Sequence, residues 1–211
     1  RRRNWSSLFR LSTTLTEDVD VEYLKNALDI TARRFPSMAV RLKAGMFWYY
    51  VEEVPNLPDI ATERAFPLSR MGNNDIKKCA FRVIVYKNRI AVEFFHALTD
   101  GTGGLVFLKT LVAEYLKLRY MAEIPCVDGV LDTLEEPKPE ELEDSFMKIK
   151  SNVCAKRGDS VAFNIEGTKE VDDFTTNTAF IFKAEELRAK ARSYGATVTA
   201  YLCALMAKSC L

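Results

Sequence analysis

Short stretches of alternating apolar and polar residues run through the first half of the chain, and each is typical of a β-strand. After the first of them, apolar residues recur at helical spacing. Asp20 is a favourable N-cap for this helix, and Pro36 ends it. Residues 52–75 contain three prolines and few periodic positions, so we expect a long surface connection there. The predicted strands are residues 5–14, then 38–43 and 47–51 as one hairpin, then 78–86 and 90–95 as a second.

The pattern changes twice in the second half. Residues 103–120 carry a wide apolar stripe at helical spacing, and Thr102 is a candidate cap for that helix. Residues 123–173 are charged and broken by prolines, with a short helix expected through Lys150. Order returns with a predicted strand at 176–183, a helix at 184–194 and an apolar helix that begins at Val198.

This order of elements predicts an α/β fold, in which a mixed, largely antiparallel sheet and the helices packed on it form a two-layer sandwich. We expect three regions along the chain. Residues 1–122 form the first half of the fold, residues 123–173 are a polar linker or crossing segment, and residues 174–211 begin a second half.

Composition excludes several classes of partner. The chain has 30 basic and 29 acidic residues, which does not indicate a nucleic-acid footprint or a basic membrane patch. No apolar run approaches the roughly 20 residues that a membrane helix needs. The five cysteines are scattered, and with a single histidine they satisfy no zinc template. We therefore expect reduced thiols in a cytoplasmic protein.

The chain's single histidine stands at the end of a predicted strand. His96 is followed by Asp100 and Gly101, and Gly103 and Gly104 complete a glycine-rich turn before the long helix. Histidine titrates near neutral pH, so it can accept a proton from a hydroxyl or an amine, while the glycines leave room beside it. A lone histidine is also a common packed or surface residue, and Asp-Gly is a frequent turn in its own right.

The spacing of His96, Asp100 and Gly101 resembles the H-x-x-x-D-G motif of the coenzyme A-dependent acyltransferase superfamily. Chloramphenicol acetyltransferase and condensation domains are members, and the nearest likeness is to alcohol acetyltransferase-like proteins. Residues 35–42, Phe-Pro-Ser-Met-Ala-Val-Arg-Leu, are similar to a segment that plant members write as YPLAGRL. Residues 195–203 are similar to the start of the second half of these enzymes. The resemblance thus implies a chloramphenicol acetyltransferase-like fold, of which this chain is the N-terminal half.

The resemblance also implies roles for residues. His96 would be the general base for an acceptor alcohol or amine that attacks acyl-CoA, with acetyl-CoA as co-substrate and no bound cofactor. Asp100 would turn away from the substrate and pair with Arg41, supporting the loop together with Gly101. Residues expected to line the substrate tunnel are Gly103, Gly104, Trp48 and Tyr50. Phe95 stands where condensation domains carry a second histidine, which argues against peptide-bond formation.

Other functions have weaker support in the sequence. A non-catalytic binding or assembly module with the same fold remains the alternative. Cys79 and His96 fall on neighbouring predicted strands, but a buried structural thiol is the simpler interpretation of Cys79. The aromatic run at Trp48 is equally typical of plain packing. The chain contains no G-x-S-x-G nucleophile elbow, and its glycines lack dinucleotide or P-loop spacing.

In the resembling superfamily the site lies in a tunnel between two halves, and we expect this chain to pack with its own C-terminal half. Residues 1–211 alone are therefore expected to show no transferase activity. Thiol release from acetyl-CoA in the presence of an alcohol measures this directly. Turnover by the isolated chain would contradict the expectation.

Overall fold

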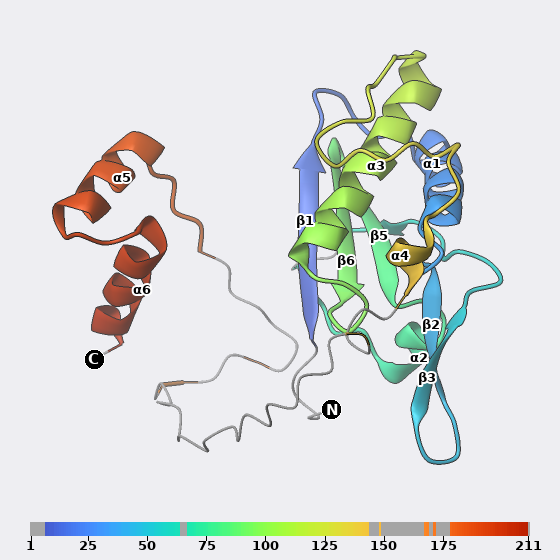
Figure 1. Cartoon of the computed structure of the whole chain (residues 1–211), viewed down its shortest axis with the longest axis horizontal. Coiled ribbons are helices and arrows are strands. Elements are labelled where there is room, and N and C mark those ends of the chain that lie inside the picture. The colour runs from blue at the N-terminus through green and yellow to red at the C-terminus, as the bar shows by residue number, and fades with distance from the viewer. Residues whose placement is uncertain are drawn as a thin grey trace. The chain divides into compact units, whose positions relative to one another are not determined.

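The computed structural model describes residues 7–63, 67–143, 148, 167–168, 171 and 178–210. The chain divides into two compact units (Figure 1). The first comprises Arg1–Val153 with Asp172–Thr175, and the second comprises Cys154–Val171 with Thr176–Leu211. The sheet, its hairpin and the helices α1 to α4 belong to the first unit, and helices α5 (Ala184–Ser193) and α6 (Val198–Ser209) belong to the second.

A mixed sheet of four strands forms the centre of the first unit, in the order β1-β6-β5-β4. All neighbours run antiparallel except β4 and β5, which are parallel. A separate antiparallel hairpin is made by β2 and β3. The strands are β1 (Leu8–Thr14), β2 (Val40–Ala44), β3 (Tyr49–Glu53), β4 (Ala61–Thr62), β5 (Phe81–Tyr86) and β6 (Arg89–Phe95).

Two helices, α1 (Val21–Arg34) and α3 (Gly101–Tyr120), pack on one face of this sheet (Figure 1). The Asp20 side chain caps α1, as the sequence predicts, by accepting hydrogen bonds from the amides of Glu22 and Tyr23. Two shorter helices are α2 (Asn73–Ile76) and α4 (Pro139–Leu142). Among the described residues, no helix combines the length and apolar character required to cross a membrane.

Side chains of β6 alternate between the two faces of the sheet. Ile90, Val92 and Phe94 face the helices and are fully buried in the core. The Phe94 ring stacks on Phe9 at a centroid distance of 5.3 Å and meets Phe107 of α3 edge-on at 5.7 Å. The helix face of β6 therefore carries the main apolar core of the first unit.

Helix α3 approaches the sheet closely at Gly104. A Cβ atom at this position would lie 3.1 Å from ring atoms of Phe9 and Phe94 and 3.2 Å from a methyl group of Leu11. Such distances are tighter than ordinary van der Waals contact, and the two rings are held by the core. The absence of a side chain at 104 thus allows the first turn of α3 to rest on β1 and β6.

The opposite face of the sheet is centred on Glu93, whose side chain is completely buried. Arg10 and Arg82 lie directly across from Glu93 on β1 and β5. The Nε atoms of Arg10 and Arg82 donate to its carboxylate at 2.8 and 2.6 Å, and the Leu68 amide donates at 2.8 Å. One buried carboxylate therefore ties three strands to the segment that covers this face.

The fold class expected from the sequence is confirmed, because the first unit has a mixed sheet with helices packed on it. The five predicted strands and both predicted helices of the first half are present, with bounds shifted by a few residues. Two elements were not predicted, β4 and α2. They have two and four residues, too few for a periodic pattern to develop.

One predicted strand is wrong where it is described. Residues 178–183 have no strand pairing, although Phe180, Ile181 and Phe182 give this stretch a strand-like composition. Their side chains are exposed, so the composition is not matched by a neighbouring strand among the described residues. Positions 176 and 177 lie outside the described residues. The same holds for most of the helix expected through Lys150, of which the structure describes α4.

Replacing Glu93 should strongly destabilise the first unit. Glu93→Gln would leave the guanidinium groups of Arg10 and Arg82 without their shared buried anion, and breaking a buried ion pair in this way costs about 3–5 kcal/mol. Denaturant unfolding, followed by tryptophan fluorescence or circular dichroism, measures the loss. Glu53→Gln, an exposed glutamate of β3, is the matched control and should change stability by less than about 0.5 kcal/mol. Equal effects of the two substitutions would contradict the central role of Glu93.

Candidate functional site

His96 follows the last residue of β6, and the backbone on both sides of it is fixed. Its amide donates to the carbonyl of Ser7 at 2.7 Å, and the amide of Phe95 donates to the carbonyl of Ala80 at 2.8 Å. The imidazole lies against the ring of Phe9 at a centroid distance of 4.9 Å, and the residue is exposed. The imidazole is therefore held against Phe9, while the residue stays accessible to a ligand.

Asp100 caps helix α3. Its Oδ1 atom accepts a hydrogen bond from the amide of Gly103 at 2.9 Å, and its backbone carbonyl accepts from the amide of Gly104 at 3.0 Å. The candidate cap from the sequence, Thr102, instead lies inside the first turn of the helix. The aspartate of the motif thus starts the helix four residues after the histidine, and it sets the path of the turn between them.

Arg41 does not pair with Asp100, which corrects the expected ion pair. Its guanidinium binds Glu52, with Nη2 at 2.6 Å and Nε at 2.7 Å from Oε2. Arg41 and Glu52 are directly opposed in the β2–β3 register, which favours this cross-strand pair. A hydrogen bond from Lys43, and then one from Arg41, lower the pKa of the Glu52 carboxyl.

The three glycines of the motif have different surroundings. Gly101 is exposed, and a Cβ atom there would meet nothing within 4 Å. A Cβ atom on Gly103 would lie 2.2 Å from Oγ1 of Thr99, so this glycine lets the turn close. Gly104 is buried against the sheet, where it serves packing. A contribution of Gly103 and Gly104 to a substrate tunnel stays a prediction.

Trp48 and Tyr50 lie on the β2–β3 hairpin and are 68% and 44% exposed. Their neighbours from Met46 to Val51 are exposed as well. The alternative that these aromatic side chains pack in a core does not hold for the first unit as described. Their expected place in a tunnel wall stays a prediction.

Cys79 is a structural thiol in this fold. It is 2% exposed within the apolar core, and burial raises the pKa of its thiol. A buried thiol with a raised pKa is a poor nucleophile. This agrees with the simpler interpretation of Cys79 rather than with a Cys79–His96 pair.

No group of three or more metal-ligating side chains occurs in the described part of the chain.

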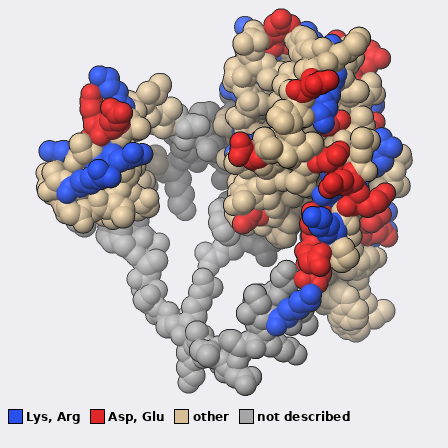
Figure 2. All heavy atoms as spheres, turned by 45° about the horizontal axis from the view of Figure 1, so that its top comes forward, with Lys and Arg blue, Asp and Glu red and all other residues tan. Residues whose placement is uncertain are grey.

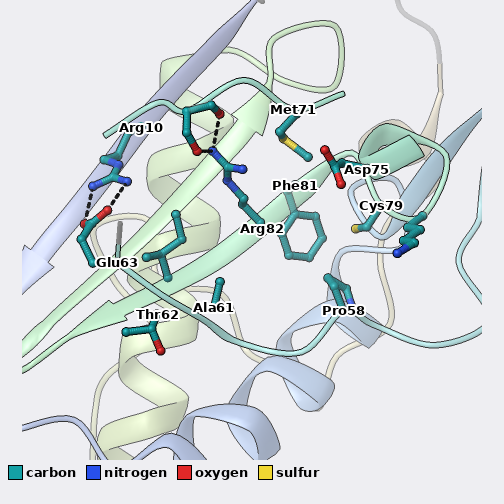
Figure 3. A pocket seen from close by; sticks show the side chains of 13 residues that line it. Arg10, Pro58, Ala61, Thr62, Glu63, Met71, Asp75, Cys79, Phe81 and Arg82 are labelled. Carbon is teal, nitrogen blue, oxygen red and sulfur yellow. Dashed lines mark hydrogen bonds and ion pairs between the residues drawn. The ribbon is translucent and has the colours of Figure 1, made fainter. Parts of the chain in front are cut away.

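The structure also contains a pocket that the sequence did not reveal (Figure 3). It has a volume of about 210 Å³ and lies beside the charged face of the sheet. Two of the residues that line it, Arg10 and Arg82, are partners of Glu93. The sequence held a signal for this site, because Arg82 and Glu93 are single charges inside apolar strands and both belong to the predicted hairpin.

The described surface mixes charges of both signs. Figure 2 shows acidic and basic side chains interspersed on the face that it presents. This agrees with the near balance of charges in the whole sequence.

The cap on α3 generates a test of what Asp100 does. Asp100→Ala removes the acceptor for the Gly103 amide and should lower stability by about 1 kcal/mol. Asp100→Asn retains a side-chain oxygen at the cap and should stay close to the wild type, although it carries no charge. Thermal or denaturant unfolding of both variants measures the difference. Equal losses in the two variants would instead point to an ion pair.

Comparison with known proteins gives similarity at the level of structure. No protein-family model matches the sequence, and no curated protein matches it either. Among solved structures, SgcC5 protein from Streptomyces globisporus is 14% identical with a TM-score of 0.47, over 58% of this chain and 32% of that one. Polyketide synthase associated protein 5 from Mycobacterium tuberculosis is 19% identical with a TM-score of 0.43, over 52% and 29%. The starter condensation domain of rhizomide synthetase RzmA is 10% identical with a TM-score of 0.43, over 58% and 35%. This chain thus spans about a third of the length of the solved structures it matches.

Proposed function

We propose that this chain carries the general base of an acyl-CoA-dependent acyltransferase, of the O-acetyltransferase type, and that His96 is this base. One observation carries the proposal. The single histidine of the sequence is fixed at the end of β6 with its ring exposed, one turn before the N-terminus of α3. A base needs both a defined position and access to its substrate, and the H-x-x-x-D-G spacing is the one that the resemblance assigns to this role.

The reaction follows from the chemistry of a neutral imidazole. An unprotonated ring nitrogen of His96 accepts the proton of an acceptor hydroxyl or amine while the acceptor attacks the thioester carbonyl of acyl-CoA. The carbon–sulfur bond then breaks, and the acyl group stays on the acceptor as an ester or amide. The imidazolium returns its proton to the departing sulfur, so the products are acylated acceptor and free CoA.

Asp100 serves this reaction through the backbone. As the cap of α3 it fixes the end of the turn that begins at His96, and Gly103 allows that turn to close. The positioning depends on a hydrogen bond to an amide rather than on Arg41, which is engaged with Glu52. Asp100 is therefore a positioning residue in this proposal, and His96 is the catalytic residue.

The proposal is tested by replacing His96 in the full-length protein. His96→Ala should lower kcat/KM for thiol release from acetyl-CoA by about 10²–10⁴-fold over a panel of alcohols and amines. The residue is exposed, so the variant should unfold at the same temperature as the wild type.

A second variant controls for nonspecific effects. Thr14 is exposed and pairs with Arg89, at the end of β1 that lies away from His96. Thr14→Ala should therefore leave the rate unchanged. If His96→Ala equals the wild type, or if no acyl donor is turned over by the wild type, the catalytic role is wrong. The second result would favour a non-catalytic binding or assembly module.

A further inference from the structure

We propose that the pocket beside the charged face of the sheet binds a small monocarboxylate, with Arg82 as the contact for its carboxylate. The apolar part of the ligand would be about as large as a benzene ring. This is a binding site separate from the one around His96, and it does not depend on the proposed acyl transfer.

The pocket has a charged end and an apolar end. In Figure 3 the ion pair of Arg10 and Glu63 lies at one end, and Met71, Phe81 and Cys79 lie toward the other, with Arg82 between them. Met71, Phe81 and Cys79 are each 2% exposed or less, and the Phe81 ring also packs on Phe94 and Phe107, so this end of the pocket borders the apolar core. A ligand with one polar end and one apolar end matches this arrangement.

The volume limits the size of the ligand. The cavity measures about 210 Å³, and an apolar cavity of about 150 Å³ is known to hold benzene. A phenyl group with a one-carbon carboxylate arm is therefore of suitable size, whereas CoA itself is far too large to be enclosed.

Arg82 has hydrogen-bonding capacity left over. Its Nε atom donates to Glu93 at 2.6 Å, and its Nη2 atom donates to the carbonyl and the hydroxyl of Ser69 at 2.5 and 3.0 Å. Within the described part of the chain, Nη1 has no such acceptor. The side chain of Arg82 is only 19% exposed, so its guanidinium is largely withdrawn from water. A bound acceptor would supply the hydrogen bond that Nη1 lacks. Carboxylates and phosphates both suit arginine, and a carboxylate is the smaller group for a pocket of this size.

The acidic groups around the pocket are engaged by other donors. Glu93 accepts from Arg10, Arg82 and the Leu68 amide, and both oxygens of Glu63 bind Arg10. On the rim, the Asp75 carboxylate accepts from the amide of Gly72 at 2.8 Å. For Arg10, burial on its own lowers the pKa of the guanidinium, but the hydrogen bonds to Glu63 and Glu93 outweigh it and raise that pKa. Each of these three carboxylates therefore already has a hydrogen-bond donor, and Glu63 and Glu93 have arginine partners.

His96 does not take part in this site. It is not among the residues that line the pocket, and its ring packs on Phe9, which belongs to the helix face of the sheet. Loss of one site should therefore leave the other intact.

Titration of this chain with phenylacetate tests the proposal, with phenylethanol as the uncharged analogue of similar size. Calorimetry should show saturable binding of phenylacetate with a Kd of about 1 mM or tighter. Phenylethanol should bind at least about tenfold more weakly because it has no charge for Arg82. Methyl resonances of Met71 and Ile84, which line the pocket, should shift on titration.

Two variants locate the site. Ala61→Phe, on the exposed strand β4, places a ring where Ala61 lines the pocket and should weaken phenylacetate binding at least about tenfold. Arg82→Lys keeps the positive charge beside Glu93 but removes Nη1, and it should reduce the preference for phenylacetate over phenylethanol. Arg89→Lys is the matched control, because Arg89 binds Glu63 from outside the pocket. The proposal is overturned if phenylacetate shows no saturable binding at about 10 mM, if Ala61→Phe binds it as the wild type does, or if phenylethanol binds equally well.

Discussion

The first unit depends on one buried carboxylate. Glu93 is withdrawn from water in the middle of the sheet, and a bare carboxylate there would be strongly unfavourable. Arg10 from β1 and Arg82 from β5 offset this cost, because the register places both directly opposite Glu93. The same register aligns the apolar side chains on the other face. A slip of one residue would bury the wrong face and separate the charges, so Glu93 helps to select a single alignment.

The side chains of strand β6 point alternately to the two faces of the sheet, and both candidate sites lie next to this strand. Ile90, Val92 and Phe94 alternate toward the helices, and Glu93 points to the pocket side, three residues before His96. On the helix face, the ring of Phe9 packs on Phe94 and also contacts the exposed ring of His96. The apolar core therefore supports the imidazole at the end of the strand.

Sequence patterns predicted the elements with strong periodicity and missed the short ones. Long helices such as α1 and α3, and the strands of both hairpins, show repeated apolar positions, whereas β4 and α2 are too short to do so. The position of His96 at a strand end was also predictable, since the strand and the helix on each side are clear. The ion-pair partner of Arg41 was not predictable from the sequence. It depends on the register of the hairpin and on the use of Asp100 as a helix cap, which a motif does not encode. The pocket was missed because it brings together residues from four separate stretches of the chain.

The cap at Asp100 changes which physical property of the motif matters. An ion pair between Asp100 and a distant arginine would require a negative charge and would respond to salt. A helix cap requires an oxygen acceptor at short range, which asparagine or serine also supplies. In this chain the charge partner of Arg41 comes from its own hairpin, so no ion pair joins Arg41 to the aspartate of the histidine turn. The geometry of the turn is then encoded locally, in the five residues from His96 to Asp100 and the glycines that follow.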